Sequence, residues 1–263
     1  MAATALVRDV LWRVAVLLQD TTPQFQRWTE RELVHWLNDA QVAIVKFLPS
    51  AASRVDAIKL AAGTRQSIAS IAAANCKPGD GSTPSATIYG TLFLNPRRNM
   101  GADGLTPGRA VRMVDRDVLD SQTPNWHTLT GADVASVVFD PLTPRFFYVT
   151  PGVPAGQDRW LEVAYNAAPT SIPNVAAAGS EAYANAGSSI VTIGVDDEHV
   201  DDLVNYVVAR ANMKDGKYAD PAKAVAHTNL FLGSLNAKVT AMTGANPNLR
   251  MLPGVDVAKR AAA

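Results

Sequence analysis

The feature that most constrains the fold is a change of hydrophobic period along the chain. Near both ends, apolar residues recur at steps of three and four, as on one face of an α-helix. The middle is rich in proline, glycine and β-branched residues and alternates as strands do. The expected helices span roughly residues 5–19, 29–48, 197–215 and 221–243. This layout predicts an α+β fold, with a helical bundle formed by the N- and C-terminal helices and a β-rich insertion between them.

The change of period divides the chain into four parts. Residues 1–53 and 196–244 are expected to supply the two halves of the helical bundle. Residues 54–195 form the β-rich insertion with long loops, and residues 245–263 an extended C-terminal tail. Within the insertion, residues 167–189 are rich in alanine, glycine, proline and serine, and we interpret them as an extended loop.

Two of the expected helices begin with a recognisable chemical signature. Thr29 lies three residues before Glu32, a capping box in which each side chain satisfies a free backbone N–H of the other residue. Asp220 precedes Pro221, which pairs a good capping residue with proline at the first helical position. Acidic residues 196–198 would place negative charge at the positive end of the third helix.

Alternating runs in the middle of the chain predict strands. Residues 54–60 alternate, Gly63 and Thr64 indicate a turn, and residues 65–71 are expected to pair back as a hairpin. The stretch 140–144 holds two prolines and is expected to connect a second hairpin. The other strand candidates are residues 111–114, 135–139, 145–149 and 160–165.

Composition narrows the functional classes. The 263 residues are 48% hydrophobic and 18% charged, as in folded globular proteins. The 24 basic and 24 acidic residues cancel, so the chain lacks the basic excess that drives phosphate binding and is poorly protected against self-association. No segment reaches the roughly 18 uninterrupted apolar residues needed to span a bilayer, so we expect no membrane partner.

The acidic run 196–202, which includes His199, is the strongest candidate for catalytic chemistry. Carboxylates with a histidine can hold a divalent ion, and a metal-dependent hydrolase is therefore kept as an alternative. The run lacks the alternating ligands and central glycine of a calcium loop, and a helix N-terminus explains its acidic bias without a ligand. We expect no catalytic residues, no metal and no cofactor.

Three further features are candidates for a functional role. Arg97 and Arg98 form one of only two adjacent basic pairs and support a nucleic-acid-binding module as another alternative. Cys76 is the only cysteine and lies in a turn-rich run without a Cys/His motif, so a nucleophilic role is disfavoured. The glycine-rich residues 101–108 lack the lysine of a P-loop and indicate a turn.

Three of the five tryptophans, Trp12, Trp28 and Trp36, lie in the N-terminal helical region. Large aromatic side chains serve equally well as core residues and as anchors of protein interfaces. The sequence leaves both roles open for these residues.

Several runs along the chain resemble one protein family. The chain is similar, over nearly its whole length, to the head-to-tail adaptor (connector, or neck) proteins of tailed bacteriophages, most closely those of short-tailed phages. The layout of helices, β insertion and helices is also that of these adaptors. The runs that carry the resemblance are residues 11–14, 28–33, 36–41, 139–141, 147–151 and 201–206.

The resemblance implies a structural virion protein without enzymatic activity. Such adaptors form a ring, usually of twelve copies, beneath the portal protein at the virion neck, after assembly in the host cytoplasm. The ring joins the portal to the next tail or nozzle protein, and genomic DNA passes through its channel without sequence-specific binding. A C-terminal extension commonly docks on the portal, which assigns Leu249, Arg250, Met251 and Leu252 to a contact with the portal or a neighbour. Another tail or tail-completion protein is the nearest alternative.

Overall fold

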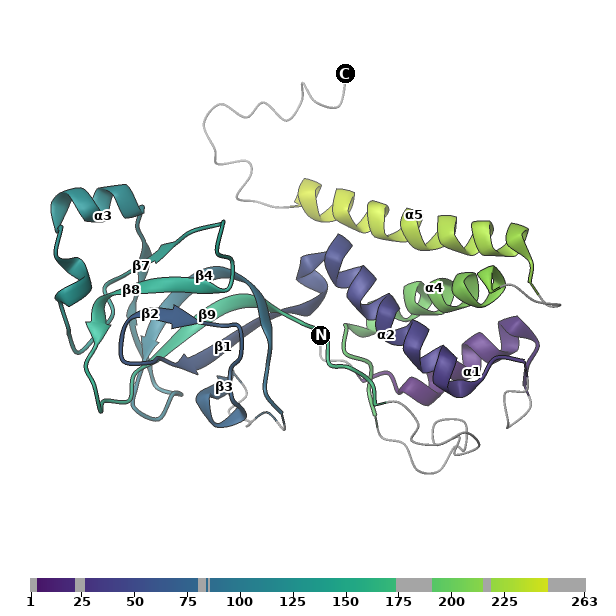
Figure 1. Ribbon diagram of the computed structural model, residues 1–263, viewed down its shortest axis with the longest axis horizontal. Helices are drawn as coiled ribbons and strands as arrows, with labels where there is room; N and C mark the ends of the chain where they lie inside the picture. The colour runs from purple at the N-terminus through teal and green to yellow at the C-terminus, as the bar shows by residue number, and fades with distance from the viewer. Residues whose placement is uncertain are drawn as a thin grey trace, which may run out of the picture. The chain divides into compact units, whose positions relative to one another are not determined.

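The computed structural model forms two compact units, shown in Figure 1. The helical unit consists of Met1–Leu48 and Thr170–Ala263, and the β unit consists of Pro49–Pro169. The α+β fold class with a β-rich insertion is thereby confirmed. The structure describes residues 4–21, 27–79, 84, 86–173, 191–214 and 219–245.

The helical unit is built around α4. Eight of the fourteen residues of α4 are buried, because α1, α2 and α5 all pack against it. Figure 1 shows α4 lying between α5 on one side and α1 and α2 on the other. None of the helices in the described ranges has the length and hydropathy to cross a membrane. The four helices are α1 (Val7–Leu18), α2 (Glu30–Phe47), α4 (Val200–Met213) and α5 (Pro221–Ala245).

The predicted helix starts are confirmed where local chemistry sets them. The backbone N–H of Glu32 donates to Oγ1 of Thr29 at 3.3 Å, and the N–H of Thr29 donates back to Oε2 of Glu32 at 3.2 Å. Oδ1 of Asp220 accepts from the backbone N–H of Lys223 at 3.1 Å and so caps α5.

The ends of two helices differ from the sequence-based expectation. The turn η4 (Asp197–His199) is a 3-10 helix, so α4 begins at Val200 and not at residue 197. Helix α5 continues through Gly244 to Ala245. One glycine in a helix costs only about 1 kcal/mol, which the rest of a 25-residue helix can absorb.

The β unit consists of two sheets with a shared apolar core. One sheet has the strand order β3-β1-β9-β4-β5 and the other β2-β8-β7-β6. The core includes Phe93, Phe147, Leu161 and Val163, with the rings of Phe93 and Phe147 stacked 4.4 Å apart. The strands are β1 (Ser53–Lys59), β2 (Gly63–Ser67), β3 (Cys76–Pro78), β4 (Gly90–Met100), β5 (Pro107–Ala110), β6 (Arg112–Met113), β7 (Ser136–Phe139), β8 (Phe146–Val153) and β9 (Trp160–Ala167).

The predicted hairpin of residues 54–60 with 65–71 is wrong. Strand β1 pairs with β3 and β9, whereas β2 pairs with β8 in the other sheet. The Gln66 side chain bridges the connection, accepting from the backbone N–H of Ala61 at 2.7 Å and donating to its carbonyl at 2.8 Å. The turn at Gly63 therefore passes the chain from one sheet to the other.

The second predicted hairpin is confirmed, because β7 pairs with β8 across residues 140–144. The short helix α3 (Arg116–Gln122) and the long strand β4 were not expected from the sequence. Strand β4 was missed because its register against β9 shifts at three places and Pro96 interrupts it, which breaks the period of two.

Candidate functional site

The acidic run that the sequence singled out ties distant parts of the helical unit together. The carboxylate of Asp197 accepts hydrogen bonds from the backbone N–H groups of Thr4 and Ala5, each at 2.8 Å, and from the Thr4 hydroxyl. These bonds, led by the one from the Thr4 hydroxyl, lower the pKa of Asp197. This carboxylate therefore anchors the N-terminal segment beside the start of α4.

Two more carboxylates of the run are paired with neighbouring helices. Glu198 lies 2.8 Å from Nζ of Lys238 on α5, and the bond from that lysine lowers the pKa of Glu198. Asp201 lies 3.3 Å from Nη1 of Arg13 on α1. Both pairs link helices that already pack on α4.

His199 is fully buried and is bound within its own segment. Its Nδ1 lies 2.9 Å from Oδ2 of Asp202, which is also buried, and its Nε2 lies 3.6 Å from Oε1 of Glu198. Asp197 and Asp201 are thus turned to partners elsewhere in the unit, whereas Glu198 and Asp202 lie beside His199. Among the residues that the structure describes, no group of three or more His, Cys, Asp or Glu side chains could hold a metal ion.

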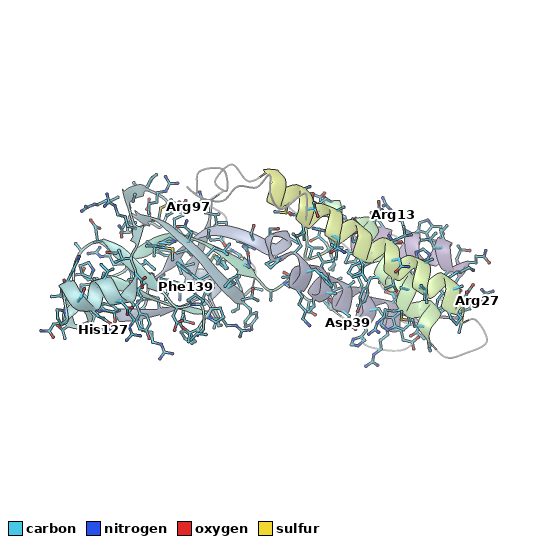
Figure 2. The ribbon with its side chains drawn as sticks, turned by 90° about the horizontal axis from the view of Figure 1, so that it is seen from above. Arg13, Arg27, Asp39, Arg97, His127 and Phe139 are labelled. Carbon is cyan, nitrogen blue, oxygen red and sulfur yellow. The ribbon has the colours of Figure 1, made fainter. Side chains whose placement is uncertain are left out.

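The basic pair Arg97–Arg98 does not form one cationic patch. Arg98 pairs with Glu162 of β9, with Nη2 3.1 Å from Oε1 and Nε 2.9 Å from Oε2. Arg97, labelled in Figure 2, is exposed. One of the two charges is therefore neutralised by a neighbouring strand.

Cys76 lies in β3 and not in a turn, and it is buried. Burial raises the pKa of its thiol to about 12, with a further contribution from the carboxylate of Asp56. A thiol of this kind is a poor nucleophile, because the reactive thiolate is scarcely populated at neutral pH.

The tryptophans that the sequence left open have different roles. Trp28 is buried, and its Nε1 donates to the backbone carbonyl of Ala211 at 3.2 Å. Trp12 on α1 is 57% exposed, and two further residues of the same helix, Val16 and Leu17, are about half exposed. Trp28 is therefore a core residue, whereas Trp12 stands in an exposed apolar group.

Helix α5 also carries exposed apolar side chains, with Val225 and Leu230 each 57% exposed. The apolar period of residues 221–243 predicts a buried stripe on this helix and gives no sign of these outer residues. The available signal was the charge pattern, since the 25 residues of α5 contain two lysines and no carboxylate. A solvent-exposed helix usually carries charge on its outer face, and a helix that is apolar on both faces is normally covered.

The residues assigned to a partner contact, Leu249, Arg250, Met251 and Leu252, lie outside the described residues. The same holds for most of the expected loop 167–189, of which residues 174–189 are not described.

The fold is that of a helical unit that carries a β insertion. The family model described as SU10 adaptor protein matches residues 5–251, and the chain belongs to this family. It is therefore a structural adaptor protein of a bacteriophage virion of the head-to-tail type. A search of curated proteins gave no match.

Proposed function

We propose that this adaptor forms a ring of twelve copies that joins the portal protein to the next tail or nozzle protein at the neck of a short-tailed phage. Membership of the adaptor family, over residues 5–251, carries the proposal. Assembly would take place in the host cytoplasm, and the ring would remain in the virion until the genome is ejected.

The exposed apolar side chains of the helical unit support a role in assembly. Single exposed apolar residues are common on monomers, but clustered ones mark sites of association. Trp12 and Val16, four residues apart on α1, form such a cluster on a helix whose other face is buried, and α5 carries the further exposed residues Val225 and Leu230. A subunit of a ring would cover them.

The charge balance of the chain supports a channel through which DNA slides. A lumen rich in lysine and arginine would release counterions on binding phosphates and hold the DNA. With 24 basic and 24 acidic residues, the chain has no such excess, so we expect a neutral or weakly acidic lumen and no sequence-specific DNA binding.

The division into bundle halves 1–53 and 196–244, insertion 54–195 and tail 245–263 remains part of the proposal. The tail would reach the portal or a neighbouring subunit. Leu249, Met251 and Leu252 would supply its apolar anchors and Arg250 a polar contact.

The mass of the purified full-length protein, alone and mixed with the portal protein of its phage, tests the proposal. Native mass spectrometry should show a complex of twelve adaptor copies on the portal. The same complex, imaged by electron microscopy, should have a central channel wide enough for duplex DNA. A protein that never binds the portal in either measurement would refute the adaptor role proposed for it.

A further inference from the structure

We infer that neighbouring copies of this chain contact each other through two unlike faces of the helical unit, one on α1 and one on α5. The inference rests on the proposed ring and names the surfaces that build it. The α1 face consists of Asp9, Trp12, Arg13, Val16 and Leu17, which are all exposed. The α5 face consists of Val225, Ala226, Leu230, Gly233 and Ala237, which are also all exposed.

The α5 face is large and uncharged. Helix α5 contacts the rest of the helical unit through α4, and its buried residues Ala224, Phe231 and Leu235 lie on that side. Helical geometry places Ala226, Gly233 and Ala237 on the opposite side. At about 1.5 Å per residue, the twelve steps from Val225 to Ala237 extend this face over about 18 Å.

The α1 face has the complementary shape. Its residues recur at steps of three and four and therefore form one stripe on the outer side of the helix, away from buried Val10, Leu11 and Val14. Trp12, Val16 and Leu17 are large side chains that project from the helix. On α5, the side chains of Ala226 and Ala237 are small, and a Cβ added at Gly233 would meet nothing within 4 Å. Large apolar side chains can therefore approach the α5 backbone closely.

Charge favours contact between these unlike faces over contact between like ones. Helix α5 contains no carboxylate, and its two lysines are both paired, Lys223 with Asp220 just before the helix and Lys238 with Glu198. The segments around the α1 face, residues 8–13 and 196–201, contain two arginines and five carboxylates. Arg13 joins these two segments through its pair with Asp201. With two lysines and Asp220, residues 220–245 carry a net charge of +1, whereas two arginines and five carboxylates give the segments around the α1 face a net charge of −3, so unlike faces attract and like faces repel.

A second copy of the chain is the occupant that both faces share. Both α1 and α5 pack on α4, which lies between them in Figure 1, so one molecule does not cover its own α5 face with its own α1 face. A contact between two different faces of identical subunits is heterologous, and repeated contacts of this kind give a ring when the rotation between neighbours closes, as in the ring proposed above. The two faces therefore explain how one helical unit can have a neighbour on each side.

Engineered disulfides test this contact directly. The native Cys76 is buried and its pKa is raised, so it should not form disulfides with the new exposed cysteines. Val16→Cys would be combined in turn with Ala226→Cys, Gly233→Cys or Thr240→Cys in the full chain, assembled on the portal and oxidised. We expect at least one pair to give a ladder of dimers, trimers and larger covalent species on non-reducing gels, and the single variants to give none.

The control pairs Val16→Cys with Leu142→Cys, an 89% exposed position in the β unit, and should give no ladder. Leu230→Asp should also prevent ring formation with an unchanged circular dichroism spectrum, while Leu142→Asp should leave the ring intact. Two results together would overturn the inference but leave the adaptor role standing. These are normal ring formation by the Leu230→Asp variant and the absence of a ladder from all three cysteine pairs. Loss of portal binding by a Leu230→Asp ring would assign the α5 face to the portal instead. Failure of the unmodified protein to form a ring would refute the proposed function itself.

Discussion

The hydroxyl of Tyr165 donates a 2.7 Å hydrogen bond to Oδ2 of Asp56, and both side chains are buried in the β unit. Nε of Arg54 lies 2.9 Å from the same oxygen. Burial, followed by the charge of Asp56, raises the pKa of Tyr165, which keeps the hydroxyl protonated as a donor. A buried carboxylate in a sheet core thus has two partners, and each should matter for stability.

Tyr165→Phe removes one of these partners without changing the ring that packs in the core. We expect the free energy of unfolding of the β unit to fall by about 1–3 kcal/mol, because the Asp56 carboxylate stays buried with fewer hydrogen bonds. Urea unfolding followed by tryptophan fluorescence would measure the change. Tyr89→Phe, at an exposed position, is the matched control and should change stability by less than about 0.5 kcal/mol. Equal effects of the two substitutions would contradict the role given to the Tyr165 bond.

Cys76 should not react with a thiol reagent in the folded protein. Its side chain is buried and its pKa is raised to about 12, so at pH 8 both access and thiolate population are low. Labelling with an aromatic disulfide should be slow in buffer and rapid in concentrated urea. Complete labelling of the native protein within the dead time of the assay would show that β3 opens freely.

Asp103 should make the turn of residues 101–106 sensitive to acid. Its carboxylate accepts hydrogen bonds from the backbone N–H groups of Leu105 and Thr106, each at 3.0 Å, and from the Thr106 hydroxyl at 2.8 Å. These bonds, the backbone bond from Thr106 first, lower the pKa of Asp103 to about 2. Because the folded pKa lies below the unfolded one, the contribution is present above about pH 4 and is lost as the pH falls toward 2.

The pH dependence of unfolding would detect this contribution. The stability advantage of the wild-type protein over Asp103→Asn should be constant near neutral pH and should shrink between about pH 4 and pH 2. Asp133→Asn, at another exposed position in the β unit, is the control. A difference between wild type and Asp103→Asn that does not vary with pH would rule out the carboxylate as its source.

Gly90 should not tolerate alanine. A Cβ at this position would lie 2.6 Å from the backbone carbonyl oxygen of Ile68, which also accepts the N–H of Gly90 at 2.8 Å. Overpacking of this kind costs about 1–3 kcal/mol, and we expect a loss of that size in thermal or urea unfolding. Gly79→Ala is the control, since a Cβ there would meet nothing within 4 Å. A Gly90→Ala variant as stable as Gly79→Ala would show that the backbone of β4 can shift at no cost.

The C-terminal tail should contribute to the proposed contact with the portal. Replacing Leu249, Met251 and Leu252 together by alanine should weaken the binding of the adaptor to the portal at least tenfold in a sedimentation or interferometry assay, with the unfolding curve unchanged. Replacing Val255 and Val257 by alanine keeps the tail and its length and is the control. Full binding by the triple variant would remove these residues from the contact.

Local chemistry made parts of this fold predictable from the sequence. The Thr29–Glu32 capping box and the Asp220 cap act over three residues, and both were visible in the sequence and formed in the structure. Pairing across long separations was not predictable. Arg65–Ile71 was assigned to the nearest strand, but β2 joins β8 about eighty residues later because the chain changes sheets at Gly63.

The candidate site residues were likewise predictable only where residues close in sequence decide their role. The acidic run was visible, but the partners that decide its role, Thr4 and Lys238, lie far away in the sequence. The outer face of α5 was not predictable from its apolar period, because that period marks only the side that packs on α4. The scarcity of charge, two lysines and no carboxylate in 25 residues, is the sequence signal for it.

The placement of α4 also has a consequence for synthesis on the ribosome. Helices α1 and α2 are made first, yet the helix that covers their apolar sides ends only at Met213. The β unit, one continuous stretch from Pro49 to Pro169, is complete before then and can fold by itself as it emerges. The apolar faces of α1 and α2 thus stay uncovered in the nascent polypeptide through most of translation. A chaperone would be needed most during this period.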